Sequence, residues 1–445
     1  MTALGIWRPF LRVRSEVSYN AAAPQTADEW NVPTTGIGGA NGWLDAIDAQ
    51  DGVGLQSNAP LIFPQMKVGA RGMNTVPPVA GSRLPELGSL VMPVVPEMII
   101  PWLRGIFPSI TKTPTAGTAA LASTAFASVA TLDAQPTTLE QLKFTIASST
   151  ASSSAVINII QNATTVETIT IGTSGSSVDG IYYSKFAYDG SVNAITFSVA
   201  GTVTSGTVVI AGIKYTTQNF KFSTSASASL VVEQANRVEI GAGNSEYFPG
   251  CKIPTSQWAF DRNAQDNLFL ATLNLHGLAP TVTTSTTYAG DAKAGSVAAY
   301  RVMAGWTCAV EIDDASNLEV VSANIAINPN DEIYSVASGT QSPSAASEGP
   351  SEFFADVVLI PTGTTRFDDY EDATARKLKF TFASPYFVNG STPYSVVITA
   401  NECYPATYAR ANQNTVQSAS VQYRGVVNAT DGGACQVDVV SRMPV

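Results

Sequence analysis

The stretch Tyr247–Ala279, YFPGCKIPTSQWAFDRNAQDNLFLATLNLHGLA, indicates the fold class of this chain. It predicts a strand, a loop and then a long alternating strand that ends at a glycine. Within Asn267–Leu275, one face carries Phe269, Ala271, Leu273 and Leu275, and the residues between them face the other way. A period of two over this length is typical of a strand with one face in a core.

A second stretch, Ala406–Val427, ATYARANQNTVQSASVQYRGVV, has the same design. An ungapped alignment at an offset of 148 residues places Phe260 on Tyr408 and gives four identical pairs. These are Arg262 with Arg410, Gln265 with Gln413, Ala271 with Ala419, and Gly277 with Gly425. Upstream elements recur in the same order, so we predict two copies of one β-domain.

The composition favours sheets and argues against nucleic-acid recognition. The chain has 445 residues, of which 45% are hydrophobic and 13% are charged. That length suggests about two to four domains. The net charge is −11 and His276 is the only histidine. A surface that grips phosphates needs clustered lysine and arginine, which this balance does not favour.

The cysteines and the N-terminal sequence suggest neither a zinc site nor an exported protein. Cys251, Cys308, Cys403 and Cys435 form no C-x-x-C pair, which argues against zinc and leaves disulfide pairing open. The N-terminus has no basic region ahead of an apolar run, so we expect no signal peptide. No stretch approaches the roughly 20 apolar residues of a membrane span. We therefore expect synthesis and retention in a cytoplasm.

The first half is predicted to be a domain with an insertion. Residues 1–60 are expected to be an arm that packs on a surface. The first domain is predicted at 61–119 and 217–280, with a strand at Leu61–Arg71 and a short helix at Pro96–Phe107. Thr111–Ala134 is low-complexity and predicts a linker. Residues 120–216 predict a small inserted β-sandwich of about six strands. Those strands are expected at Leu142–Ile146, Ala155–Ile160, Val166–Ile171, Ile181–Tyr188, Ala194–Val199 and Thr207–Ile213.

The second domain is predicted at 297–445. Leu318–Asn328 and Glu352–Thr362 are expected to pair around a long loop, followed by a short acidic helix at Asp368–Arg376. The long loops at about 72–86 and 329–351 are predicted to contact neighbouring rings of an assembly, since loops of this length are usually functional or disordered.

Several stretches give the chain a resemblance to a known family. It resembles the major tail tube proteins of long-tailed, non-contractile phages, in the form with two tube domains per chain. The stretches lie outside about 118–216. They are LRVRSEVSYNAAAPQTADEW (11–30), GSLVMPVVPEMIIPWLRGIF (88–107), NFKFSTSASASLVVEQ (219–234), EYFPGCKIPTSQWAF (246–260), LATLNLHGLA (270–279), GWTCAVEIDDASNLEVVSANIAIN (305–328) and ADVVLIPTGTTRFDDYEDATARKLKFTF (355–382).

The resemblance implies a fold and a function. The fold would be all-β, with two tandem tail-tube-type β-sandwich domains, each with a short flanking helix. The small β-sandwich inserted in the first domain departs from the family and would face outward, decorating the tube. The protein would be a structural virion protein of the tail, assembled in the host cytoplasm. It would form stacked rings, homotrimeric and pseudo-hexameric, as a conduit for DNA ejection. Its partners would be itself, the tape measure protein, genomic DNA without specific binding, the tail terminator and distal tail proteins. The family has no catalytic residues, and no cofactor or membrane is implied.

Strand alternation places candidate residues on this picture. Ser322, Asn324, Asp356 and Glu233 are predicted to face the lumen, opposite the apolar set Val321, Ala323, Ile325 and Ile327. Core or inter-subunit anchors are expected at Trp102, Phe260, Arg262, Tyr408 and Arg410. An acidic lumen would repel phosphate and let DNA slide.

The sequence gives little support to enzyme chemistry. A Ser–His–Asp arrangement would have to use His276, which we interpret as structural. Asp313–Asp314 and Asp368–Asp369 are interpreted as a turn and a solvated helix start. Neither a phosphate-binding loop nor a G-x-S-x-G motif is present. Two alternatives stay open: another virion β-sandwich protein, such as a tail spike or capsid decoration, and a carbohydrate-binding surface protein.

Overall fold

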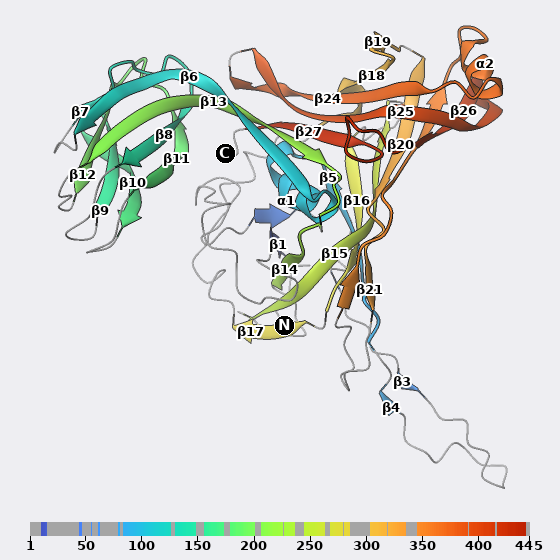
Figure 1. Cartoon of the computed structure of the whole chain (residues 1–445), viewed down its shortest axis with the longest axis horizontal. Coiled ribbons are helices and arrows are strands. Elements are labelled where there is room, and N and C mark those ends of the chain that lie inside the picture. Colours follow the sequence, from blue (N-terminus) through green and yellow to red (C-terminus); the bar gives the residue numbers. More distant parts are fainter. Residues whose placement is uncertain are drawn as a thin grey trace, which may run out of the picture.

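The protein is all-β, as the sequence predicts. The computed structural model describes residues 10–15, 44–46, 55, 61–62, 79–80, 83–125, 130–147, 155–172, 179–200, 206–225, 227–235, 244–262, 268–278, 280–284, 303–317, 319–334, 345–389, 391–413 and 416–441. Large antiparallel sheets dominate this part of the chain (Figure 1). Its two α-helices are α1 (Pro96–Ile106) and α2 (Thr365–Glu371).

Seven strands from both halves of the chain form one antiparallel sheet, here called the joined sheet. The strand order is β5-β16-β15-β20-β23-β26-β25. The strands are β5 (Glu86–Pro93), β16 (Leu270–His276), β15 (Asn244–Asp261), β20 (Val320–Asn328), β23 (Glu352–Leu359), β26 (Val416–Gly425) and β25 (Thr392–Gln413). The halves meet where β15 pairs with β20, from Ser256 opposite Ile327 to Asp261 opposite Ser322.

Further strands surround the same core. The first group runs β18-β24-β25-β27-β13-β6, and the second runs β2-β1-β14-β15-β17. The bounds are β18 (Cys308–Ile312), β24 (Arg376–Asn389), β27 (Gln436–Ser441), β13 (Thr207–Lys221), β6 (Ser109–Ala125), β2 (Leu44–Ala46), β1 (Phe10–Ser15), β14 (Leu230–Ala235) and β17 (Thr281–Thr284). Strands β1 and β2 lie within the segment 1–60, which is predicted to be an arm that packs on a surface, and β1 pairs with β14 along its whole length.

The two halves use the same pairing scheme. In the first half, β14 lies between β1 and β15, and β15 also pairs with β16 and β17. In the second half, β24 lies between β18 and β25, and β25 also pairs with β26 and β27. Strands β5 and β23 hold matching places beside β16 and β26, and each precedes a helix.

Strand register corrects the alignment made from sequence. Lys252 lies opposite His276, and Tyr404 lies opposite Arg424. Because 424 is 276 + 148 whereas 404 is 252 + 152, β25 matches β15 at an offset of 152 residues. Cys251 and Cys403 then coincide, and each thiol points at the carbonyl three residues earlier.

The predicted equivalences of Phe260 with Tyr408 and of Arg262 with Arg410 are therefore wrong. The connection between the strands is shorter in the second half: β15 ends at Asp261 and β16 begins at Leu270, whereas β25 ends at Gln413 and β26 begins at Val416. An ungapped alignment cannot represent this difference. Gln265, another matched residue, lies outside the described residues.

The inserted body contains two four-stranded sheets around its own core. One sheet runs β10-β9-β12-β7, and the other is formed by β11, β8, β13 and β6. The new strands are β7 (Ala130–Thr131), β8 (Glu140–Ala147), β9 (Ala155–Gln161), β10 (Thr164–Gly172), β11 (Gly180–Tyr188) and β12 (Ile195–Ala200). Each of the six predicted strands overlaps one of these or β13.

A pair of long strands, not a linker, connects the inserted body to the rest. Strands β6 and β13 run side by side from the main core into the inserted body (Figure 1). The predicted linker at Thr111–Ala134 is wrong through Ala125, because β6 continues to that residue. At the neck the buried Glu140 carboxylate accepts N–H bonds from Thr118 and Ala119, each at 2.8 Å. It lies against Gly117 and Gly212, where a Cβ would collide with it.

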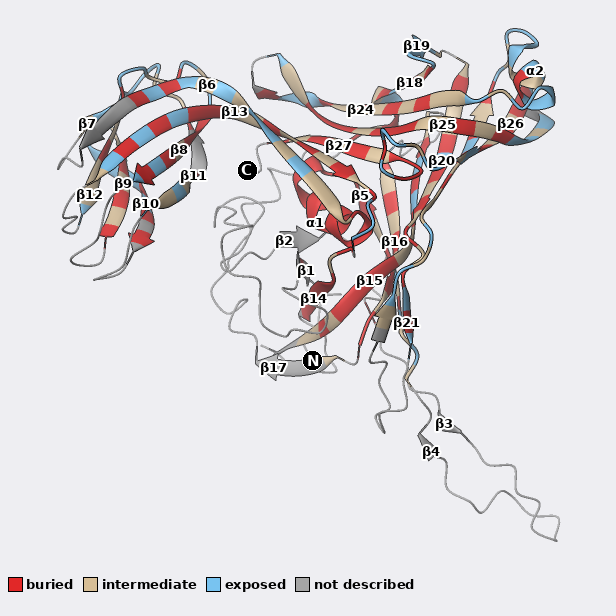
Figure 2. Ribbon diagram, viewed as in Figure 1, coloured by how far each residue is buried: buried red, intermediate tan, exposed pale blue. Residues whose placement is uncertain are grey.

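One hydrophobic core runs through both halves (Figure 2). All residues of α1 are buried, including Trp102, which is predicted to be a core or inter-subunit anchor and is 0% exposed within the chain. Pro96 suits the first turn, where its missing N–H is no loss. Phe260 and Phe269 pack against Phe382 of the second half, with the rings of Phe269 and Phe382 stacked 3.5 Å apart. Burial of a large apolar side chain contributes about 1.5–3 kcal/mol, so these aromatic contacts hold the two halves together.

Candidate assembly surface

The joined sheet has a polar face directed away from the core. Along β20, Ala323, Ile325 and Ile327 are buried, whereas Asn324 between them is exposed. One row of Cα partners on this face crosses all seven strands. Its members are Pro93, Leu270, Ala259, Asn324, Asp356, Gln422 and Thr407. Strand alternation thus gives both halves a common outer surface.

Side-chain hydrogen bonds link neighbouring strands on this face. Ser89 donates from Oγ to Asn274 Oδ1 at 2.6 Å, and Asn274 donates from Nδ2 to Thr255 Oγ1 at 2.6 Å. In the second half, Gln422 donates from Nε2 to Asp356 Oδ1 at 2.8 Å. The face therefore combines amides and hydroxyls, whose hydrogen bonds are already made in part, with apolar residues such as Leu270, Phe354 and Val358.

The charge on this face is sparse and mainly acidic. Its charged side chains include Glu86, Asp261, Glu352, Asp356 and Arg424, with His276 opposite Glu86. Lys252, the Cα partner of His276, is buried beside Asp331. Burial lowers the pKa of His276, partly opposed by Glu86, and so favours the neutral imidazole. Arg424 is the one cation of the set, and Glu352 pairs with it at 3.4 Å. Such a face offers little attraction to phosphate groups.

The structure places three of the four predicted lumen residues on this face and removes the fourth. Ser322, Asn324 and Asp356 share it. The prediction that Glu233 is solvated is wrong, because its side chain is 0% exposed. Glu233 belongs to β14, which lies between β1 and β15 in the sheet. Val321 was predicted to face the core, but the register shift between Val320 and Ser322 buries Val320 instead.

Both ends of the joined sheet lack a described strand partner. At one end, β5 pairs with β16 alone among the described strands. At the other, the segment Tyr404–Gln413 of β25 pairs with β26 alone. Unpaired backbone groups along a strand edge recruit other strands unless they are covered.

The junction inside the chain shows how such an edge is covered. The edge of β15 that corresponds to the Tyr404–Gln413 edge of β25 pairs with β20 of the other half. Arg262 donates its backbone N–H to Val321 O at 3.1 Å, and Ser256 Oγ donates to Ile327 O at 2.6 Å. The Arg262 guanidinium donates to Cys308 O, so this predicted anchor joins the two halves of one chain.

Helix α2 and the edge of β25 form a corner at the far end of the sheet. Tyr408 packs edge-on against Phe367, and Tyr370 lies 6.3 Å from the same Tyr408 ring. The Arg410 guanidinium sits 5.3 Å above the Phe367 ring. The sequence analysis identified Tyr408 and Arg410 but missed Phe367 and Tyr370. The predicted helix began at Asp368, one residue after Phe367.

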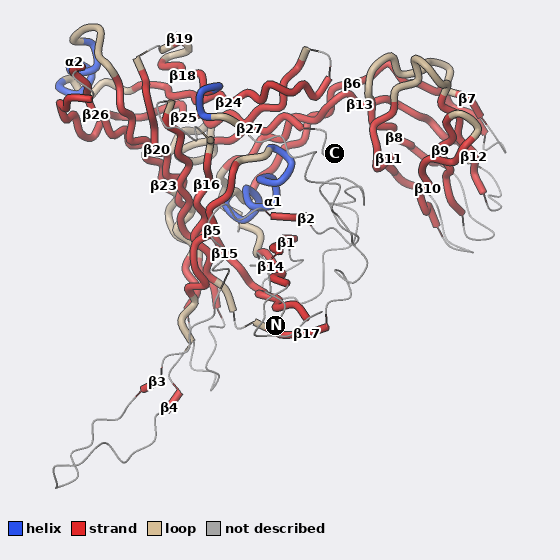
Figure 3. Tube along the Cα trace, turned by 180° about the vertical axis from the view of Figure 1, so that it is seen from behind, coloured by secondary structure: helices blue, strands red, loops and turns tan. Residues whose placement is uncertain are grey.

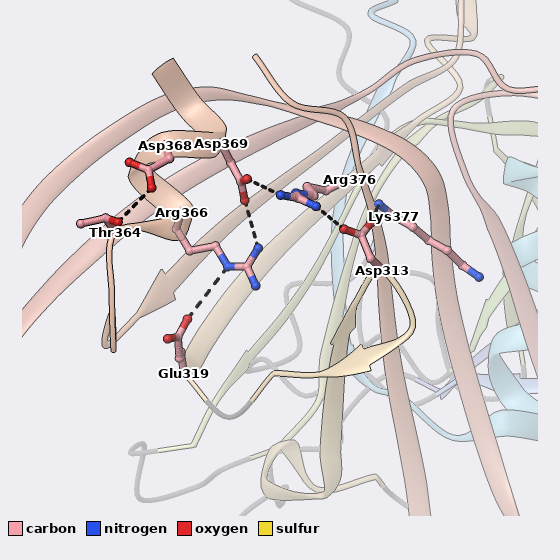
Figure 4. A network of polar contacts seen from close by, with 8 residues as sticks. All are labelled: Asp313, Glu319, Thr364, Arg366, Asp368, Asp369, Arg376 and Lys377. Carbon is pink, nitrogen blue, oxygen red and sulfur yellow. Dashed lines mark hydrogen bonds and ion pairs between the residues drawn. The ribbon is translucent and has the colours of Figure 1, made fainter. Parts of the chain in front are cut away.

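An ion-pair network fixes α2 at this corner (Figure 4). Arg376 bridges Asp369 of α2 to Asp313, the latter at 2.6 Å, and Arg366 bonds Asp369 at 3.0 Å. Burial alone would raise the pKa of Asp313, but the Lys377 backbone N–H and the Arg376 guanidinium lower it overall. Asp313–Asp314 is the predicted turn, and both residues have positive φ.

Two short strand pairs lie toward the same end of the joined sheet (Figure 1, Figure 3). In the segment 329–351, β21 (Glu332–Tyr334) pairs with β22 (Ala345–Ser347). In the other pair, β3 (Leu61–Ile62) pairs with β4 (Val79–Ala80), and most of 72–86 lies outside the described residues. At the base of the first, the buried Asp331 carboxylate accepts a hydrogen bond from Ser227 and lies 3.5 Å from Lys252 Nζ.

The four cysteines are all buried free thiols. Among the described residues, no helix has the length and apolar character needed to cross a bilayer. No cluster of three metal-ligating side chains occurs in the described part of the chain. In comparisons with known proteins, no protein-family model matches this chain, and no curated protein matches it.

Proposed function

We propose that this protein is the major tail tube subunit of a long-tailed, non-contractile phage. One observation carries the proposal: two similar halves contribute to a single sheet with a polar outer face and two edges that pair with no further strand among the described residues. Each half adds to the next through a strand edge, so repeating the same step with further copies would extend the sheet. An interface of this head-to-tail kind closes into a ring when the rotation per step permits.

The polar face would line the channel. Its amides and hydroxyls interact with water, and its few charges are mainly acidic, so double-stranded DNA would pass without being held. Each chain supplies two wall units, and a wall of six units therefore takes three chains. The tape measure protein would occupy the channel before DNA, and tail terminator and distal tail proteins would bind the tube ends. The inserted body would project outward from the wall.

Electron microscopy of the purified full-length chain tests the proposal. We expect stacked rings with a central hole in negatively stained images. Isolated fibres would indicate a tail spike, and dispersed monomers at high protein concentration would contradict self-assembly. Two-dimensional class averages should show six wall units per ring and three outer projections. A ring without threefold symmetry would contradict the chain count.

A further inference from the structure

The two helices occupy equivalent places but differ in how they are covered. Helix α1 packs on β15 of its own half and also contacts β25 and β27 of the other half. All of its residues are buried. Helix α2 packs mainly on β25 of its own half, and Tyr370 remains 39% exposed. The second half therefore covers α1, whereas the corresponding side of α2 faces solvent.

We propose that α2 and the Tyr404–Gln413 edge form a docking surface for the first half of a second copy of this chain. This inference rests on the proposed ring assembly and identifies the side chains that make its contact. The arrangement of the first half against the second half places α1 against β25 and β27. If the second half packs in the same way against the first half of another copy, α2 lies against β15 and β17 of that copy. The contact between the two halves of one chain thus identifies the docking partner as the first half of a second copy.

The chemistry of the corner suits such a contact. Phe367, Tyr370 and Tyr408 present aromatic surface beside the Arg410 guanidinium. Tyrosine and arginine dominate the binding energy of many protein interfaces, where they are surrounded by polar rims. The exposed rim here includes Asp368, Glu371 and Asp372. The Asp369–Arg376 pair holds the helix in place before the partner arrives, which reduces the ordering cost of binding.

Site-specific photo-crosslinking tests the contact in the full chain. Tyr370 is replaced by p-benzoylphenylalanine, an aromatic residue that suits this exposed position. Isotopically light and heavy chains are mixed before assembly, so that crosslinks between copies can be recognised by mass. We expect crosslinks between copies from position 370 to β15 or β17. The control carries the same residue at Val192, which is 88% exposed on the inserted body and should give no such crosslink.

Charge substitution gives an independent measurement. Tyr370→Glu should lower the fraction of protein in rings at least about tenfold, the loss expected for an interface anchor, while Val192→Glu should not change it. Crosslinks found only within one chain, or rings that persist at full yield in Tyr370→Glu, would overturn the docking surface and leave ring formation intact. An unmodified chain that forms no rings would instead overturn the proposed function itself.

Discussion

Gln422 and Asp356 are joined by a 2.8 Å hydrogen bond between β26 and β23 on the polar face of the joined sheet. Asp356 is exposed, and this bond uses one of its two carboxylate oxygens. If this face lines a channel, the Asp356 carboxylate recurs in every subunit at the same height.

Asp356→Lys should convert the channel from repelling DNA to retaining it. The side chain is exposed, so tubes should still assemble. Co-sedimentation of tubes with short double-stranded DNA should then increase at low salt and disappear at high salt, where charges are screened. Asp356→Asn serves as the control, since it removes the charge without adding a cation. If tubes of Asp356→Lys do not bind DNA at low salt, this face does not line the channel.

Glu233→Lys should destabilise the fold instead of altering DNA passage. Glu233 is fully buried on β14, so a lysine there would place an uncompensated charge among packed strands. We expect a loss of about 3–5 kcal/mol in the free energy of unfolding, measured by urea denaturation. Glu233→Gln keeps the shape and should cost less. Equal stability of all three proteins would show that the site is open to water.

The inserted body should be removable if the paired strands of its stalk are kept. Ala116 lies opposite Ile213 in the β6–β13 ladder, so an Asn-Gly turn can join them in place of residues 117–212. The remaining part of β13 still pairs with β27 from Thr216 to Lys221. We expect soluble protein that forms tubes with a smaller outer diameter. A longer deletion, 110–220, should fail to fold because β27 loses that partner. A soluble, folded short deletion that never forms rings would contradict an outward position.

The α2 network should contribute stability that depends on pH. The pKa of Asp313 is lowered in the folded chain, as is that of Glu319, where Thr362 and Arg366 outweigh the effect of burial. A carboxylate with a lowered pKa stabilises the fold above its unfolded pKa, near 4, and this contribution is lost as pH falls through the folded value. Arg376→Met should therefore cost about 2 kcal/mol at neutral pH and progressively less below about pH 4.

Urea unfolding of both proteins across pH 2–8 (a range chosen to span the carboxylate pKa values near 4) measures this difference. Arg83→Met, a change outside the network, supplies the control. A cost that stays constant across the range would mean that Arg376 acts through packing and not through its ion pairs.

Shortening the β21–β22 hairpin should affect stacking but not ring closure. Residues 335–344 can be replaced by a two-residue turn that keeps the paired strands of 332–334 and 345–347. We expect single rings to accumulate and tube lengths in micrographs to fall, since the hairpin lies toward one end of the joined sheet. Tubes of normal length would exclude the hairpin as a ring-to-ring contact. A same-sized deletion within the inserted body provides the comparison.

Strand periodicity predicted the polar face well because it depends only on local alternation. Asn324 and Asp356 lie between buried apolar residues, and both strands have one face in the core. Glu233 follows the same local pattern, but a strand covered on both faces buries its polar residues too. Leu230–Gln234 are all buried, and contacts there come from distant positions, as with Leu55, whose backbone N–H donates to Gln234 Oε1 across 179 positions. No local pattern specifies such contacts.

The equivalence between the halves was harder to predict for a related reason. Gly277 and Gly425 mark the same strand end, and their match survives in the structure. The connections that precede β16 and β26 differ in length by a few residues. Only the backbone pairing shows the resulting change in the offset between β15 and β25. The aromatic corner of α2 was missed because Phe367 precedes the acidic run that signals the helix.

The way β6 and β13 carry the inserted body has an evolutionary consequence. The chain leaves and re-enters the main core through the adjacent strands β6 and β13, whose backbone ladder, together with the Glu140 carboxylate at the neck, joins the two bodies. Any module whose termini lie one strand spacing apart could be exchanged there without disturbing the neighbouring layers. If the chain assembles as proposed, this strand pair is a natural grafting point for displaying foreign peptides or enzymes at regular intervals along a filament.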